Sequence, residues 1–240
     1  MTACLFDLDG VLTQTARVHS AAWKQMFDDY LRGRARRTDE AFTPFDPIRE
    51  YDQYVDGKPR YDGVRAFLAS RGVRLAEGEQ SDTPDMETIH GLGNRKNEIV
   101  LRLIREQGVQ PYEGSVHYVK AVQAAGLRRA VVSSSTNCRD VLIAAGIQDL
   151  FEEVIDGVVA EREHLQGKPA PDTFLAGARA LGVEPAEAIV FEDALAGVEA
   201  GRAGRFGFVV GVDRVGQAEA LRAHGADLVV DDLAKLLPTP

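Results

Sequence analysis

The sequence has few of the residues that mark secreted, metal-stapled or membrane proteins. Only two cysteines occur, Cys4 and Cys138, and they form no CxxC pair, which argues against a disulfide framework or a zinc site. No apolar run approaches the roughly 18 residues of a membrane-spanning helix, and no basic-then-apolar leader is visible. We therefore expect a cytoplasmic protein without a membrane partner.

Basic residues are fewer than acidic residues. The chain has 28 Lys and Arg against 37 Asp and Glu, a formal net charge of -9, which argues against nucleic acid as the main partner. A small anionic substrate stays compatible with this charge, because local Lys and Arg side chains or a bound metal can reverse the field in one pocket. Hydrophobic residues make up 45% of the chain, enough for a substantial core.

Short apolar, β-branched runs alternate with helical stretches in the second half of the chain. This alternation predicts an α/β fold: a doubly wound, mostly parallel, Rossmann-like sheet covered on both faces. The opening run at 3–6 belongs to the same sheet. The other predicted strands are 128–133, 152–157, 188–193, 206–212 and 226–230, and the predicted helices are 114–125, 137–145, 171–181, 194–203 and 216–223.

The segment between the first strand and the rest of the sheet has helical character. Residues 15–32 carry apolar side chains at helical spacing, and further helices are predicted at 61–71 and about 86–107. We expect 1–14 and 109–240 to form the α/β core, and 15–108 to be an inserted helical cap that sets substrate specificity.

Polar side chains follow several predicted strands, where ligands bind in open α/β sheets. They are Asp7 and Asp9; Ser133, Ser134, Ser135 and Asn137; and Glu192 and Asp193, with Lys168 in a loop that opens a helix. Taken singly, such residues commonly cap helices or form turns. Together, four carboxylates at one sheet edge would repel one another unless they share a cation, and carboxylate oxygens suit Mg²⁺. An Asp can also act as a phosphoryl-accepting nucleophile, and a second Asp two residues along as general acid/base.

FDLDG, VVSSSTN, GKPAPD and FEDALAG resemble, in order, the four motifs of the haloacid dehalogenase superfamily. The resemblance implies that Asp7 is the phosphorylated nucleophile and Asp9 the general acid/base. It implies that Ser133 and Lys168 bind the transferring phosphoryl group, and that Ser134, Ser135 and Asn137 contact substrate. Asp7, Glu192, Asp193 and the backbone carbonyl of Asp9 would hold one Mg²⁺.

The helical segment resembles the β-phosphoglucomutase subfamily. Thr15, His19 and Trp23 form a TxxxHxxxW pattern on one helix face; the alternative is that His19 and Trp23 only pack against other helices. GKPRYDG resembles the subfamily's cap loop, which makes Gly57 and Arg60 candidate substrate-binding residues. The resemblance further implies that Lys96 reaches the sugar phosphate. The candidate substrate-binding set is therefore Thr15, His19, Trp23, Gly57, Arg60, Lys96, Ser134, Ser135 and Asn137.

One position departs from the pattern: Thr136 stands where the best-known members have lysine. The resemblance implies a monomeric, Mg²⁺-dependent mutase that interconverts β-glucose 1-phosphate and glucose 6-phosphate through an aspartyl-phosphate, with a sugar bisphosphate as intermediate and activator. The alternative is a sugar-phosphate phosphatase on the same scaffold. A signalling receiver domain is disfavoured, because there the acid pair precedes the phosphorylated Asp.

Overall fold

The computed structural model describes residues 1–237, and the chain forms two compact units. The first unit contains Met1–Thr15, Gly57–Pro59 and the chain from Val109 onward, and the second contains Ala16–Asp56 and Arg60–Gly108. Thr15 and the segment 57–59, which are predicted to belong to the helical insertion, thus make their contacts in the first unit.

The first unit is built on a parallel six-stranded sheet with the order β3-β2-β1-β4-β5-β6. This confirms the predicted doubly wound α/β fold. β1 has no exposed residue, because strands on both sides and helices on both faces enclose it. The strands are β1 (Ala3–Phe6), β2 (Arg128–Val132), β3 (Glu153–Ile155), β4 (Ala188–Glu192), β5 (Phe208–Val212) and β6 (Leu228–Val230).

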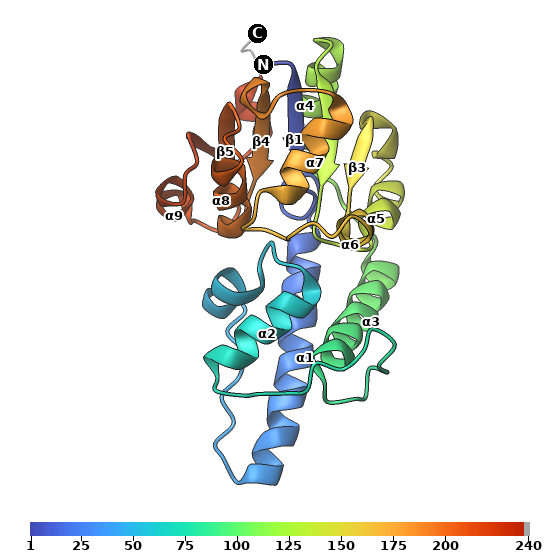
Figure 1. The fold of residues 1–240 in the computed structure, drawn as a ribbon, viewed down its shortest axis with the longest axis vertical. Helices are drawn as coiled ribbons and strands as arrows, with labels where there is room; N and C mark the ends of the chain where they lie inside the picture. Colours follow the sequence, from blue (N-terminus) through green and yellow to red (C-terminus); the bar gives the residue numbers. More distant parts are fainter. Residues whose placement is uncertain (238–240) are drawn as a thin grey trace. The chain divides into compact units, whose positions relative to one another are not determined.

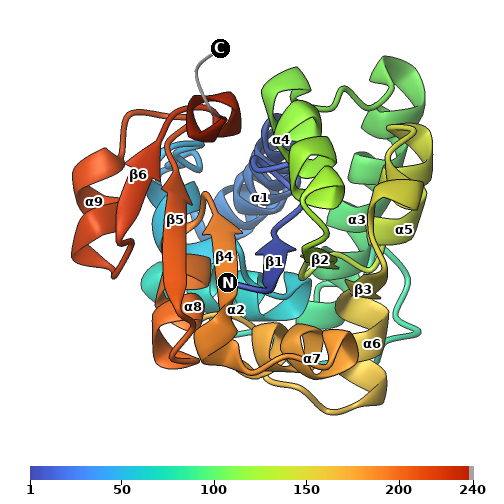
Figure 2. The same ribbon diagram turned by 90° about the horizontal axis from the view of Figure 1, so that it is seen from above.

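Helices cover both faces of this sheet. Figure 2 shows α7 and α8 on one face and α4 on the other; α7 packs on β1, β2 and β3, and α8 on β4 and β5. Phe174 of α7 and Val198 of α8 are fully buried in the core between these layers. The helices are α4 (Glu113–Ala124), α5 (Cys138–Ala144), α6 (Gly157–Arg162), α7 (Asp172–Leu181), α8 (Leu195–Ala203) and α9 (Ala218–Ala223), with short 3₁₀ turns at Gln148–Leu150, Pro185–Glu187 and Leu233–Leu236.

Helix α6 was not expected from the sequence. The predicted strand at 152–157 ends earlier, at Ile155, and the Asp156 carboxylate accepts a hydrogen bond of 2.8 Å from the Val159 amide as the helix N-cap. The helix is only six residues long, too short for its apolar residues to show a helical period.

The second unit is all helical. Figure 1 shows α1 (Thr15–Thr38), α2 (Arg60–Ser70) and α3 (Ile89–Gln107) side by side, and a π-helical turn, Tyr51–Val55, lies between α1 and α2 in the sequence. The core is aromatic: the Phe27 ring lies 4.1 Å from that of Phe67 and 5.2 Å from those of Trp23 and Phe45, centroid to centroid. The Trp23 indole therefore packs in the aromatic core of this unit.

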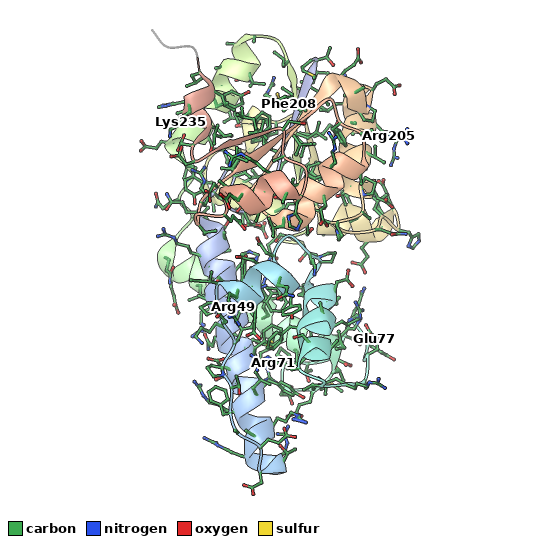
Figure 3. The ribbon with its side chains drawn as sticks, turned by 90° about the vertical axis from the view of Figure 1, so that its left-hand side faces the viewer. Arg49, Arg71, Glu77, Arg205, Phe208 and Lys235 are labelled. Atoms are coloured by element: carbon green, nitrogen blue, oxygen red, sulfur yellow. The ribbon has the colours of Figure 1, made fainter. Side chains whose placement is uncertain are left out.

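Arg71 anchors the irregular stretch that follows α1. Its guanidinium donates to the Glu50 carboxylate at 2.8 Å and to the Pro44 carbonyl at 3.1 Å, and its charge lies 5.2 Å from the centre of the Phe67 ring. Arg71 is labelled in Figure 3. Because both groups of the ion pair are largely enclosed, it fixes the path of residues 43–50 more firmly than a surface pair would.

A half-buried acid in the π-helical turn should make stability depend on pH. Burial, with the nearby Asp46 charge, raises the pKa of Asp52 to about 6. The folded chain therefore binds more protons than the unfolded chain between about pH 4 and 6, and stability falls as pH rises through that window. We expect Asp52→Asn to raise the free energy of unfolding at pH 7.5 by about 1 kcal/mol, a figure reduced for partial exposure, with no gain at pH 4.

Urea unfolding at both pH values measures this effect. Asp29→Asn, a change of the same kind at an exposed position of α1, is the control and should alter neither value. A gain for Asp52→Asn of equal size at both pH values would contradict the assignment.

Both cysteines are buried and free. Burial raises the pKa of the Cys4 thiol to about 12 and that of Cys138 well above its usual range, so both thiols stay protonated and unreactive. Within residues 1–237, none of the helices has the length and apolar character needed to cross a bilayer.

Candidate active site

The acidic residues meet where the strand order reverses. β1 and β4 are neighbours with Phe6 opposite Phe191, and the Asp7 amide donates to the Phe191 carbonyl at 2.9 Å. Asp7 therefore leaves β1 beside Glu192, the last residue of β4, and Asp193 follows directly. All three acids are buried, with exposed fractions of 7%, 0% and 8%. This is the switch point at which open α/β sheets bind ligands.

Lys168 bridges two of these acids. Its Nζ lies 2.5 Å from Asp7 Oδ1 and from Glu192 Oε1, and it also donates to the Val132 carbonyl at 3.3 Å. Burial opposes the charge on Lys168, but the two carboxylates outweigh burial and raise the pKa of its ammonium group, so it stays protonated. Lys168 thus brings a fixed positive charge to the strand end where β2 runs into Ser133.

One lysine does not balance this cluster. Burial raises the pKa of Asp7, and it raises that of Glu192 to about 7, even though Lys168 acts in the opposite direction on both. Three buried carboxylates with a single ammonium leave excess negative charge in a medium that stabilises charge poorly. A bound cation would lower the free energy of this arrangement.

The donor atoms suit such a cation. Asp7, Glu192 and Asp193 each offer a carboxylate oxygen, and these oxygens lie within 4.8 Å of one another. An all-oxygen donor set fits a hard divalent ion rather than zinc or copper. Two glycines keep the space open: a Cβ on Gly10, whose φ is +89°, would overlap the Asp193 carboxylate, and a Cβ on Gly197 would overlap that of Glu192.

Asp9 lies in a turn held by two threonines. The Thr15 hydroxyl donates to Asp9 Oδ1, and the Thr13 and Thr15 hydroxyls are 2.6 Å apart. The Thr13 hydroxyl in turn contacts the Leu8 carbonyl at 3.2 Å. Both threonines are buried while Asp9 is partly exposed, so these hydroxyl groups hold one oxygen of the Asp9 carboxylate from the protein interior. Thr15 was predicted as a substrate-binding residue; the structure places its hydroxyl on Asp9.

The serines after β2 form a tight loop. Ser133 is buried, and its hydroxyl accepts from the Ser135 amide at 3.1 Å; the Ser135 hydroxyl accepts from the Asn137 amide at 3.2 Å. The Ser134 hydroxyl donates to the Gly57 carbonyl at 2.8 Å, which joins the segment 57–59 to this loop. The loop supplies hydroxyl and amide groups, and the lysine of the resembling motif is absent from it.

Three other predicted residues lie together in the second unit. Lys96 Nζ is 3.0 Å from His19 Nδ1 and 4.9 Å from the centre of the Trp23 ring. Lys96 is the donor here, so the His19 proton belongs on Nε2. Burial, with the Lys96 charge, lowers the pKa of His19 well below its usual value and keeps the ring neutral.

Arg60, at the start of α2, is held by its neighbour. Its guanidinium carbon lies 4.9 Å from the centre of the Tyr61 ring, and the Tyr61 hydroxyl donates to Asn94 at 2.9 Å. The Tyr61 ring also stacks on His90, with centroids 3.9 Å apart. Arg60 is therefore supported by a fixed aromatic platform.

Two residues of this region were missed from the sequence. Thr13 joins the hydroxyl chain to Asp9, and Arg214 donates to the Gly10 carbonyl at 2.8 Å. Arg214 closely follows the apolar run at 206–212, so the strand-end rule used for the other candidates would have selected it. No local pattern indicates Thr13.

Comparison with known proteins agrees with this geometry. A model of haloacid dehalogenase-like hydrolases matches residues 1–205. A curated β-phosphoglucomutase from Mycobacterium tuberculosis is 57% identical over 238 residues, which cover 98% of this chain and 91% of that protein. The relationship therefore extends over both units and is not limited to the catalytic motifs.

Solved structures agree. A β-phosphoglucomutase from Clostridium difficile has a TM-score of 0.78 at 28% identity, covering 99% of this chain and 93% of that one. A haloacid dehalogenase family hydrolase from Deinococcus radiodurans, with bound phosphate and sodium, has a TM-score of 0.63 at 27% identity, covering 98% and 93%. The resemblance drawn from the motifs is confirmed: the chain belongs to the haloacid dehalogenase-like hydrolase family and, within it, to the β-phosphoglucomutase group.

Proposed function

We propose that this protein is a phosphosugar mutase that interconverts β-D-glucose 1-phosphate and glucose 6-phosphate through an aspartyl-phosphate. The observation that carries the proposal is the 57% identity to a β-phosphoglucomutase along almost the whole chain. The bound phosphate of the Deinococcus relative supports a phosphoryl ligand. The alternative, a sugar-phosphate phosphatase, would use the same acids with water as the acceptor.

Asp7 and Asp9 would divide the chemistry. Phosphorylated Asp7 gives its group to the sugar: the bond from phosphorus to the Asp7 oxygen breaks, a bond to the C6 hydroxyl oxygen forms, and the hydroxyl proton moves to Asp9. The resulting bisphosphate turns around. Asp7 then attacks the phosphorus of the C1 phosphate while Asp9 returns the proton to the departing C1 oxygen. This step releases glucose 6-phosphate and restores phosphorylated Asp7. A trace of the bisphosphate would therefore activate the enzyme.

Asp7, Glu192 and Asp193, with the Asp9 backbone carbonyl, would hold one Mg²⁺. When bound, this ion neutralises charge on the transferring phosphoryl group and on the acids around it. Lys168 and the Ser133 hydroxyl would bind other phosphoryl oxygens, with Lys168 already oriented by its two carboxylate contacts.

The second unit, Ala16–Asp56 and Arg60–Gly108, would act as the specificity cap that the sequence predicts at 15–108. A neutral His19 held by Lys96 carries its proton on Nε2 and would donate a hydrogen bond to a sugar oxygen. Arg60 would bind the phosphate that is not being transferred, since a guanidinium matches phosphate oxygens in pairs.

The test supplies β-glucose 1-phosphate with Mg²⁺ and a trace of glucose 1,6-bisphosphate. Glucose 6-phosphate is read through a coupled dehydrogenase, and inorganic phosphate is measured in parallel. The proposal expects glucose 6-phosphate in large excess. Predominant release of inorganic phosphate would show that the protein is a phosphatase and not a mutase.

Arg60→Ala should separate these reactions. If Arg60 binds the distal phosphate, mutase kcat/KM should fall by about 10²- to 10³-fold, the loss of a charged bidentate contact. Hydrolysis of p-nitrophenyl phosphate, which has no second phosphate, should change less than threefold. Arg49→Ala is the matched control, since this arginine of the same unit is 86% exposed. Equal losses with both substrates would remove the distal-phosphate role from Arg60.

A further inference from the structure

The turn that carries Asp9 is hydrogen-bonded to a second segment of the chain, residues 111–112. The Gly10 amide donates to the Thr13 carbonyl at 2.8 Å, which closes the turn. Thr13 then bridges to Pro111, and the Tyr112 amide donates to the Leu12 carbonyl at 2.9 Å. Residues 10–13 and 111–112 are therefore one hydrogen-bonded structure beside the candidate general acid.

Arg214, from the loop after β5, is inserted against this structure. Its Nε donates to the Gly10 carbonyl at 2.8 Å, and its Nη2 lies 3.4 Å from the Val11 carbonyl. The guanidinium carbon is 3.6 Å from the centre of the Tyr112 ring. The side chain is only 13% exposed although the residue lies in a loop. One planar group thus contacts both paired segments.

The remaining donors of Arg214 fix its own position. Nη1 donates to the Asp231 carbonyl at 2.6 Å and lies 3.5 Å from the Asp232 carboxylate, and Nη2 lies 3.4 Å from the Ser115 hydroxyl. The Ser115 hydroxyl itself donates to the Val11 carbonyl at 2.6 Å. A guanidinium has five N–H donors in a fixed plane, so these contacts leave it little freedom to move.

Gly10 gives this contact its importance. Its φ of +89° and its closeness to the Asp193 carboxylate require glycine, the residue with the least restricted backbone. A glycine directly after the general acid would by itself let the backbone of the turn change conformation. Arg214 holds the Gly10 carbonyl, and the Thr15 hydroxyl, itself in contact with the Thr13 hydroxyl, holds the Asp9 carboxylate.

We propose that Arg214 is a positioning residue for Asp9: by fixing the Gly10 and Val11 carbonyls, it keeps the Asp9 carboxylate where it can exchange a proton with the sugar oxygen. The inference rests on the proposed role of Asp9 as general acid/base. It assigns Arg214 no contact with substrate or metal. A small displacement of a proton donor is enough to slow transfer strongly, because proton transfer needs hydrogen-bond reach.

The test uses two phosphoryl donors that differ in their need for a proton. A sugar oxygen is a poor leaving group and requires the general acid. Acetate, the leaving group of acetyl phosphate, departs without help from a general acid. Arg214→Met should lower kcat for isomerisation of β-glucose 1-phosphate by about 10²-fold, with KM nearly unchanged. Phosphorylation of Asp7 by acetyl phosphate should stay within threefold of the wild-type rate. Arg214→Lys, which can keep a donor for the Gly10 carbonyl, should recover about tenfold.

Arg222→Met is the matched control, because this arginine of α9 is exposed on the same unit; it should leave both rates unchanged. If Arg214→Met and Arg214→Lys lose both rates equally, Arg214 only stabilises the fold and the proposal is wrong. Unchanged isomerisation in Arg214→Met would also overturn the proposal. If the wild type releases phosphate instead of isomerising, the proposed function fails, but the ratio of the two rates can still be read on sugar-phosphate hydrolysis.

Discussion

Asp7→Asn is expected to lower isomerisation of β-glucose 1-phosphate by at least about 10⁴-fold, since the variant has no oxygen nucleophile to carry the phosphoryl group. The shape of the side chain is nearly preserved. Lys168 keeps its contacts with Glu192 and the Val132 carbonyl, so the free energy of unfolding should change by no more than about 1 kcal/mol. The loss is therefore chemical rather than structural.

Asp9→Asn, the same substitution two residues along, is the informative control. It should also abolish isomerisation, but acetyl phosphate should still phosphorylate Asp7, which a mass increase of the intact protein reports. Asp7→Asn should show no such increase. If Asp7→Asn retained more than about 1% of wild-type turnover, or if both variants lost phosphorylation equally, the division of roles between the two acids would be wrong.

Lys168→Met is expected to damage both stability and activity. It removes the single ammonium group from between two buried carboxylates, and breaking a buried ion pair from one side typically destabilises by about 3–5 kcal/mol. Turnover should fall about 10²- to 10³-fold, because a preoriented positive charge at the phosphoryl group is lost. Urea unfolding and steady-state kinetics measure the two effects.

The unfolding measurement on Lys168→Met is repeated with added MgCl₂. If Asp7, Glu192 and Asp193 hold the ion, Mg²⁺ supplies part of the missing charge and should reduce the stability loss of Lys168→Met. Lys120→Met, at an exposed position of α4, is the control and should show neither the loss nor the metal-dependent recovery. A Lys168→Met protein as stable as the wild type without metal would contradict the charge balance described for this site.

The sequence is most informative about features that are local along the chain. Asp7 and Glu192 follow apolar runs directly, and parallel strands end at the same edge, so their meeting could be predicted before their contacts were known. Helix α6 could not be recognised, because six residues show no period and its N-cap, Asp156, reads equally well as the end of a strand.

Contacts between distant residues were less accessible. The strand-end rule places Arg214 at the right edge of the sheet, but the sequence does not indicate that its guanidinium meets the Gly10 carbonyl, 204 positions away. Thr15 shows a related limit: it has helical spacing with His19 and Trp23, but its hydroxyl bonds to Asp9 because Thr15 is the first residue of α1, next to the turn that carries Asp9. Tertiary packing determines these contacts, and the helical pattern alone does not.

The central claim is that Asp7 carries a phosphoryl group between two positions of a sugar. The direct measurement is to react the protein with glucose bisphosphate labelled with ³²P, locate the label in the peptide that contains Asp7, and chase with unlabelled β-glucose 1-phosphate. The account predicts label on Asp7 that passes to the sugar phosphates faster than to inorganic phosphate. Label on another residue, or label that appears only as inorganic phosphate during the chase, would contradict it.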